Sequence, residues 1–189
     1  MPNYCNYSMC AIGSKDNLEE FIKVMKADYD YGTMEFSYER HLFRVFEADY
    51  DEIEEVGPNL YQVIINGYCA WSVSSCMFNN YPISYYASIQ KESGDKFRGT
   101  TLVEESERLN LRIEVFSEEC GMCFQEHYVI INGDVIVEDC VDWEEYCLED
   151  YETKEEAEED LGIEITDEEW ESGESYISRG GFGEWDFSI

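Results

Sequence analysis

A strongly acidic segment near the C-terminus, residues 138–174, most limits what this chain can fold into. It reads EDCVDWEEYCLEDYETKEEAEEDLGIEITDEEWESGE and holds nineteen Asp or Glu residues against one basic residue, Lys154. Its net charge of −18 is more than half of the −32 carried by the whole chain. A run of like charge such as this usually marks a disordered tail that repels itself.

The acidic segment nevertheless carries large apolar side chains at a density that a solvating tail does not have. Thr153 and Thr166 each stand three residues before a glutamate, the spacing of a capping box, which predicts a helix after each threonine. Gly162 and Gly173 then end the two helices. The segment is therefore predicted to fold as an acidic surface anchored by its own apolar residues, namely Val141, Trp143, Tyr146, Leu148, Tyr151, Leu161, Ile163, Ile165 and Trp170.

The composition allows a folded core and argues for a basic partner. Of the 189 residues, 44% are hydrophobic and 15% aromatic, enough for one domain or for one domain with an appended lobe. The excess of acid argues against direct binding to nucleic acid or to an anionic membrane. The N-terminus lacks a signal-peptide pattern, and no stretch is apolar over eighteen residues. We expect a cytoplasmic protein whose eight cysteines are mostly reduced thiols.

The order of elements before the acidic segment predicts an α+β fold. Hydrophobic periodicity predicts strands near 4–12, 40–47, 60–69 and 111–117, the third of them bulged at Asn66-Gly67, and helices near 16–28 and 100–109. Residues 49–58 are expected to form a connection. Residues 72–90 fit either a short helix with a Pro-bounded loop or a helix that resumes after Pro82. The resulting β-α-β-β-α-β order is that of ferredoxin-like folds.

A hairpin and an edge strand complete the predicted sheet. Asn132-Gly133 lies between two β-rich runs and permits the positive φ angles of a type I′ turn, which predicts a hairpin over 124–138. The tail after residue 177 is Gly-rich but aromatic, so we expect it to dock as an edge strand. We predict two parts: a ferredoxin-like α+β domain over 1–138, extended by the hairpin, and a C-terminal acidic, mostly helical lobe with the edge segment over 139–189.

The opening MPNYCNYSMCAIGSKDNLEEFIKVM resembles the start of the YubB-like ferredoxin-like proteins carried by phages and plasmids. The matching positions are Asn3, Tyr4, Cys5, Gly13 and Phe21. The segments GYCAWSVSSCM and NLRIEVFSEECGMCFQEHYVIINGD are also similar to that family, so the resemblance covers most of residues 1–138. It implies a ferredoxin-like fold and a mobile-element context. It carries over no catalytic residue, and the acidic segment lies outside it.

The charge density of the acidic segment suggests nucleic-acid mimicry. If all 37 residues were helical they would span roughly 55 Å, at about 1.5 Å each. Nineteen acids would then give about one charge per 3 Å, close to the ~3.4 Å between phosphates along one DNA strand. The glycines forbid one continuous helix, so this is an upper bound. By analogy with acidic DNA mimics among anti-CRISPR and anti-restriction proteins, we expect a non-enzymatic inhibitor that blocks a host nuclease.

The expected partner is a basic nucleic-acid-binding protein of the bacterial host, either a CRISPR effector such as Cas9 or a restriction nuclease. Two alternatives stay open: an accessory phage or plasmid protein whose acidity is only a solubility surface, and a small zinc-binding regulator. The residues expected to contact the partner are Asp142, Glu144, Glu145, Glu149, Asp150, Glu152, Glu155, Glu156, Glu158, Glu159, Asp160, Asp167, Glu168 and Glu169.

The zinc alternative depends on Cys120, Cys123 and His127. A C-x-x-C pair on a tight turn can place two thiolates on one zinc ion, and His127 or Cys140 could complete the tetrahedron. The sequence has no second C-x-x-C, and cysteine is also a common small buried hydrophobe. No cofactor is otherwise expected, and the sequence has neither a G-x-S-x-G nor a P-loop motif to indicate an enzyme.

Overall fold

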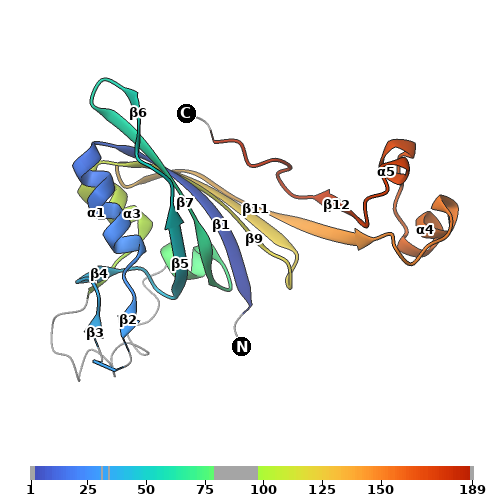
Figure 1. Ribbon diagram of the computed structural model, residues 1–189, viewed down its shortest axis with the longest axis horizontal. Helices are drawn as coiled ribbons and strands as arrows, with labels where there is room; N and C mark the ends of the chain where they lie inside the picture. The colour runs from blue at the N-terminus through green and yellow to red at the C-terminus, as the bar shows by residue number, and fades with distance from the viewer. Residues whose placement is uncertain (1–2, 31, 34, 79–97, 188–189) are drawn as a thin grey trace.

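The computed structural model describes residues 3–30, 32–33, 35–78 and 98–187, and has an α+β fold (Figure 1). Its main sheet has eight strands, all paired antiparallel. They are β1 (Tyr4–Gly13), β5 (Val45–Tyr50), β6 (Glu54–Gly57), β7 (Leu60–Ala70), β9 (Arg112–Glu119), β10 (Phe124–Ile131), β11 (Asp134–Cys147) and β12 (Tyr176–Gly180). The order across the sheet is β12-β11-β10-β9-β1-β7-β5, and β6 pairs with β7.

Two helices, α1 (Lys15–Met25) and α3 (Leu102–Leu109), lie against one face of this sheet (Figure 1). Ser14 caps α1 and Thr101 caps α3, each accepting a hydrogen bond from a backbone N–H three residues later. Phe21 from α1 and Leu102 from α3 are fully buried with the inward side chains of β1, β7 and β9. Among the described residues no helix lies on the opposite face of the sheet, which is called the open face below.

Short elements lie at one end of the sheet. They are β2 (Tyr29–Asp30), β3 (Glu35–Phe36), β4 (Arg40–His41), β8 (Arg98–Gly99) and a π-helical turn, Ser74–Phe78. Most of the region predicted as either one or two helices, 72–90, lies outside the described residues. No helix in the described part of the chain has the length and apolar character needed to cross a membrane.

Two strand predictions in the first half of the chain are wrong. The strand predicted at 40–47 is two strands, β4 and β5, because Arg44 adopts a left-handed backbone (φ 50°) that interrupts the extended chain. The expected bulge at Asn66-Gly67 is absent from the β1–β7 register, which is regular there. Gly67 instead permits close contact, since a Cβ on it would lie 1.9 Å from the Glu47 carbonyl oxygen.

Buried glutamates stabilise the interior through bonds to neighbouring elements. Glu105 on α3 is fully buried between Arg40 and Arg108 and is bonded to both guanidinium groups. Glu126 on β10 accepts the backbone N–H groups of Val73 and Ser74, at 2.8 and 3.2 Å, and so caps the π-helical turn. Both carboxylates therefore have structural partners.

The acidic segment is built from strand as well as helix. β11 continues past residue 138 into it and pairs with β12, and the chain between them forms α4 (Lys154–Leu161) and α5 (Asp167–Glu171). Figure 1 shows α4 and α5 at the far end of the β11–β12 ribbon, away from α1 and α3. The two helices are as predicted. The strand before them is not apparent in the sequence, because dense acid hides the alternation of Val141 and Trp143 with polar residues.

Candidate functional site

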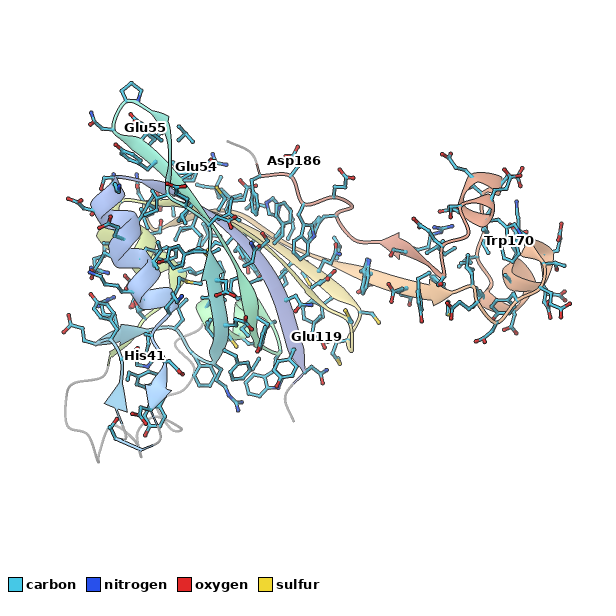
Figure 2. All side chains as sticks on the ribbon, viewed as in Figure 1. His41, Glu54, Glu55, Glu119, Trp170 and Asp186 are labelled. Atoms are coloured by element: carbon cyan, nitrogen blue, oxygen red, sulfur yellow. The ribbon has the colours of Figure 1, made fainter. Side chains whose placement is uncertain are left out.

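The fourteen carboxylates predicted to contact a partner lie on the second half of β11, on α4 and α5, and on the loop after β11. Twelve are exposed, and Glu158 and Glu169 are partly buried. Figure 2 shows Trp170, which follows Glu169 in α5, at the end of the molecule opposite Glu54 and Glu55. The structure therefore gathers these acids at one end.

Seven of the fourteen carboxylates are free to bind a partner. Their side chains make no hydrogen bond or ion pair with any residue that the structure describes, and all seven are exposed. They can therefore pair with Lys or Arg without breaking a bond within the fold. They are Asp142, Glu145, Asp150, Glu152, Glu155, Glu159 and Glu168.

The other seven carboxylates already have bonds within the fold. Glu158 accepts the Ile165 N–H at 2.9 Å, and Asp160 accepts the Tyr151 hydroxyl at 2.6 Å, which raises the pKa of Tyr151 to about 12. Both bonds hold α4 against its surroundings. The remaining five also have partners: Glu144 is bonded to Tyr146, Glu149 to Ser175, Glu156 to the Glu152 N–H, Asp167 to Lys154 and Glu169 to Arg179.

Glu169 has the most extensive set of bonds. Both of its oxygens accept from the Arg179 guanidinium, at 2.8 and 3.0 Å, and its carboxylate also accepts the Thr166 N–H as half of a capping box. The hydrogen bonds from Arg179, with those from Thr166, lower the pKa of Glu169 to about 2. Glu169 is therefore a structural residue that joins α5 to β12.

Lys154, the one basic residue of the acidic segment, is also used within the fold. Its Nζ lies 2.7 Å from Asp167 Oδ1, which connects the start of α4 to the start of α5. The hydrogen bond to Asp167 raises the pKa of Lys154, and the same bond lowers the pKa of Asp167. The only basic residue of the acidic segment is therefore paired within the fold, and it forms no ion pair with the seven exposed carboxylates that have no bond among the described residues.

A second small core supports α4 and α5. Four side chains are buried together, from the residue after β11, from α4, from the loop between the helices and from β12: Leu148, Ala157, Ile165 and Ile177. Partly buried hydrophobic side chains pack around them, including Tyr146, Tyr151 and Trp170. These aromatic residues anchor the acidic segment to itself, which is the role that the sequence predicts for them.

The predicted zinc ligands do not meet. Cys120 and Cys123 lie in the turn between β9 and β10, whereas the His127 Nε2 lies 3.0 Å from the Glu114 carboxylate on the open face. Burial, with nearby Glu118, raises the pKa of the Cys120 thiol and disfavours the thiolate that zinc requires. In the described part of the chain, no three His, Cys, Asp or Glu side chains are grouped so as to hold a metal ion.

The C-terminal tail, residues 181–187, covers part of the open face. Phe116 on β9 stacks on His127, with ring centroids 4.0 Å apart, and Trp185 lies parallel above Phe116 at 5.9 Å. Phe182 contacts both rings edge-on. The tail is therefore held by aromatic stacking on the sheet as well as by the pairing of β12 with β11.

A cavity that no sequence pattern indicates lies beside this tail. It has a volume of about 720 Å³ and lies between the tail and strands β9 to β12, with Trp143 and Trp185 in its wall. The aromatic residues of the tail predict that it docks on the sheet, but they do not indicate where a cavity forms. The cavity depends on pairings between strands far apart in the chain, which no local pattern contains.

The arrangement as a whole offers ion pairing to a basic partner. Seven exposed carboxylates without a bond among the described residues stand on a segment with its own core, whereas the buried acids Glu105 and Glu126 are engaged in structural bonds. The chain matches no family model, no curated protein and no solved structure.

Proposed function

We propose that this chain is a non-enzymatic inhibitor from a phage or another mobile element. A ferredoxin-like domain over residues 1–138 presents an acidic lobe, residues 139–189, to the basic DNA- or RNA-binding groove of a host defence nuclease, such as Cas9. The lobe occupies the groove in place of nucleic acid. The observation that carries the proposal is the concentration of charge, because the acidic segment holds −18 in 37 residues and the other 152 residues hold −14.

The order of the central strands supports a ferredoxin-like scaffold. In chain order, β1, β5, β7 and β9 are the four strands of the β-α-β-β-α-β unit, and across the sheet they run β9-β1-β7-β5. The first and third strands are thus central and antiparallel, as a split βαβ unit requires. The hairpin of β10 and β11 extends this unit outward and carries the acidic lobe at its end.

The charges of α4 support a binding role because they lower the stability of the helix. Glu155 and Glu159 are four residues apart on one face, so they repel each other. Glu159 and Asp160 lie in the last turn of α4, where the helix dipole disfavours negative charge. This last turn contains no basic residue that could offset them. Four exposed acids over a helix of about 12 Å, at about 1.5 Å per residue, give a spacing near that of phosphates.

The alternative, that the acid serves only solubility, predicts a different distribution of charge over the surface. An accessory protein that uses acid only to stay soluble needs charge spread over its surface. Here the net charge is concentrated in the acidic segment, and two of its acids, Glu159 and Asp160, lie in the last turn of α4, where negative charge opposes helix formation. This distribution favours a binding surface that attracts a basic groove through long-range electrostatic steering.

The test compares two variants that lose equal charge. The binding variant replaces Glu155, Glu159 and Glu168 with glutamine, all three of them carboxylates without a bond in the described structure. The control replaces exposed acids on β6 and just before it, and Figure 1 shows β6 far from α4 and α5: Asp51→Asn, Glu52→Gln and Glu55→Gln. Each is used in pull-downs against purified CRISPR effectors and restriction nucleases, with and without their nucleic acids, at low and high salt.

The native chain is expected to bind a nuclease at low salt, to lose it at high salt, and to be displaced by DNA or guide RNA. The binding variant is expected to lose most of this binding, and the control to keep it. Equal loss in both variants would contradict mimicry by the acidic lobe. Binding that nucleic acid does not displace would indicate an allosteric inhibitor, and no binding to any nuclease would favour the accessory-protein alternative.

A further inference from the structure

The cavity beside the C-terminal tail combines aromatic and acidic walls. Trp143 of β11 and Trp185 of the tail line it, together with the carboxylates of Glu118 and Glu184. None of the described residues that line it is basic. Arg179, on the neighbouring strand, has its guanidinium bonded to Glu169 and to the Glu164 carbonyl. The cavity therefore has no positive charge of its own to compensate its two carboxylates.

The walls are held in place before any ligand arrives. Gln125 is buried, accepts the Phe182 N–H at 2.7 Å, and donates to Glu118 at 3.3 Å, so it links the tail to the cavity floor. Trp185 is fixed by its parallel stacking on Phe116. A ligand therefore does not need to order these groups, which lowers the entropic cost of binding.

Two adjacent glycines allow the tail to pass this close to the floor, and a Cβ on the first, Gly180, would lie 2.4 Å from the Asp142 carbonyl oxygen. Gly181 has a φ of 69°, and a Cβ on it would lie 2.5 Å from the Gln125 Oε1 and 2.9 Å from a ring carbon of Trp143. Any side chain at this position would therefore push the tail away from Trp143. The approach of the tail to the sheet, and with it the shape of the cavity, depends on both glycines.

We propose that this cavity binds the side chain of an arginine or lysine of a basic protein partner. The faces of indole rings attract cations, and two indole rings beside two carboxylates form the kind of site that recognises guanidinium and ammonium groups. A volume of about 720 Å³ is within the range of ligand sites and admits a side chain together with its flanking peptide. The identity of the partner rests on the proposed function, whereas the cation preference rests on the cavity alone.

The test uses the full chain and two small probes that differ only in charge. N-acetyl-arginine methylamide carries the guanidinium, and N-acetyl-citrulline methylamide carries a neutral urea of the same shape. The chain has four tryptophans, so their indole N–H signals in a nitrogen–proton spectrum report on four separate places. Trp170, in the small core, and Trp71, which already faces Arg44 at 4.6 Å, serve as internal references.

The arginine probe is expected to shift the Trp143 and Trp185 signals to saturation, and the citrulline probe to leave them unchanged. Glu118→Gln and Glu184→Gln are each expected to weaken the arginine probe about two- to fivefold, the worth of a partly exposed ion pair. Glu55→Gln, far from the cavity, is the matched control.

Three results would overturn the proposal. They are equal shifts with both probes, equal shifts at all four indoles, and no shift at saturating arginine probe. Because the probes contain no nuclease, these results are independent of the pull-down experiment. A cation site can thus be found in a chain that binds no nuclease, and a nuclease inhibitor can lack the site.

Discussion

Arg179 holds the carboxylate of Glu169 with both terminal nitrogens, at 2.8 and 3.0 Å, and so joins β12 to α5 across the small core. The same guanidinium donates to the Glu164 carbonyl at 2.7 Å. A basic residue outside the acidic segment thus organises its second helix. Some of the carboxylates that the sequence assigns to a binding surface, such as Glu169, are therefore already bonded within the fold.

Glu169 should make the stability of this region depend on acid. Its pKa is lowered from 4.5 to about 2 in the folded state, so its contribution is fully present above about pH 4.5 and is lost as the pH falls towards 2. Hydrogen exchange of α5 and β12 amides should therefore show weakening protection over this window. Glu169→Gln should lose about 1 kcal/mol of this local stability at neutral pH and flatten the dependence. An unchanged pH profile in the variant would mean that Glu169 is not the group responsible.

Neutralising Glu159 should stabilise α4. Glu159→Gln removes a repulsion with Glu155 and an unfavourable charge at the helix C-terminus, so we expect a gain of about 0.5 kcal/mol in helix stability by hydrogen exchange. Glu155→Gln removes the same repulsion but takes a favourable charge from the first turn, and its net effect should be close to zero. If both variants behave alike, the helix dipole does not distinguish the two positions.

Close packing at Gly67 should make it intolerant of any side chain. A Cβ there would lie 1.9 Å from the Glu47 carbonyl oxygen, which also accepts the Tyr7 hydroxyl at 2.8 Å. Gly67→Ala must separate β7 from β5, and should lower the free energy of unfolding by about 2–3 kcal/mol in a denaturant titration. Gly99→Ala, which meets nothing within 4 Å, should change it by less than about 0.5 kcal/mol.

The sequence predicts best those elements whose limits depend on adjacent residues. Ser14, Thr101, Thr153 and Thr166 each cap the expected helix, because a side chain and a backbone N–H three residues apart suffice to start it. The Asn132-Gly133 turn has the positive φ angles that its sequence requires. By contrast, β6 was expected to be a connection, because it is a strand only through its pairing with β7.

The candidate site is less predictable for the same reason. Composition places the acid correctly at one end but cannot say which carboxylates are free. Glu169 is bonded to Arg179 through the pairing of β12 with β11, and His127 is drawn to Glu114 on the neighbouring strand rather than to the cysteines of the turn. Both outcomes follow from strand register, which sets side chains distant in the sequence beside each other.

The small core should let the acidic segment unfold without the main sheet. Ile165 is 1% exposed, and Ile165→Ala should cost about 2–5 kcal/mol, much of the stability available to a core of four buried residues. Hydrogen exchange should then show lost protection in α4 and α5 and unchanged protection in β1, β7 and β9. Ile136→Ala, at a 59% exposed position on β11, should alter neither region. Protection lost throughout the chain would instead show that the acidic segment and the sheet fold as one cooperative unit, and would contradict the division into two parts.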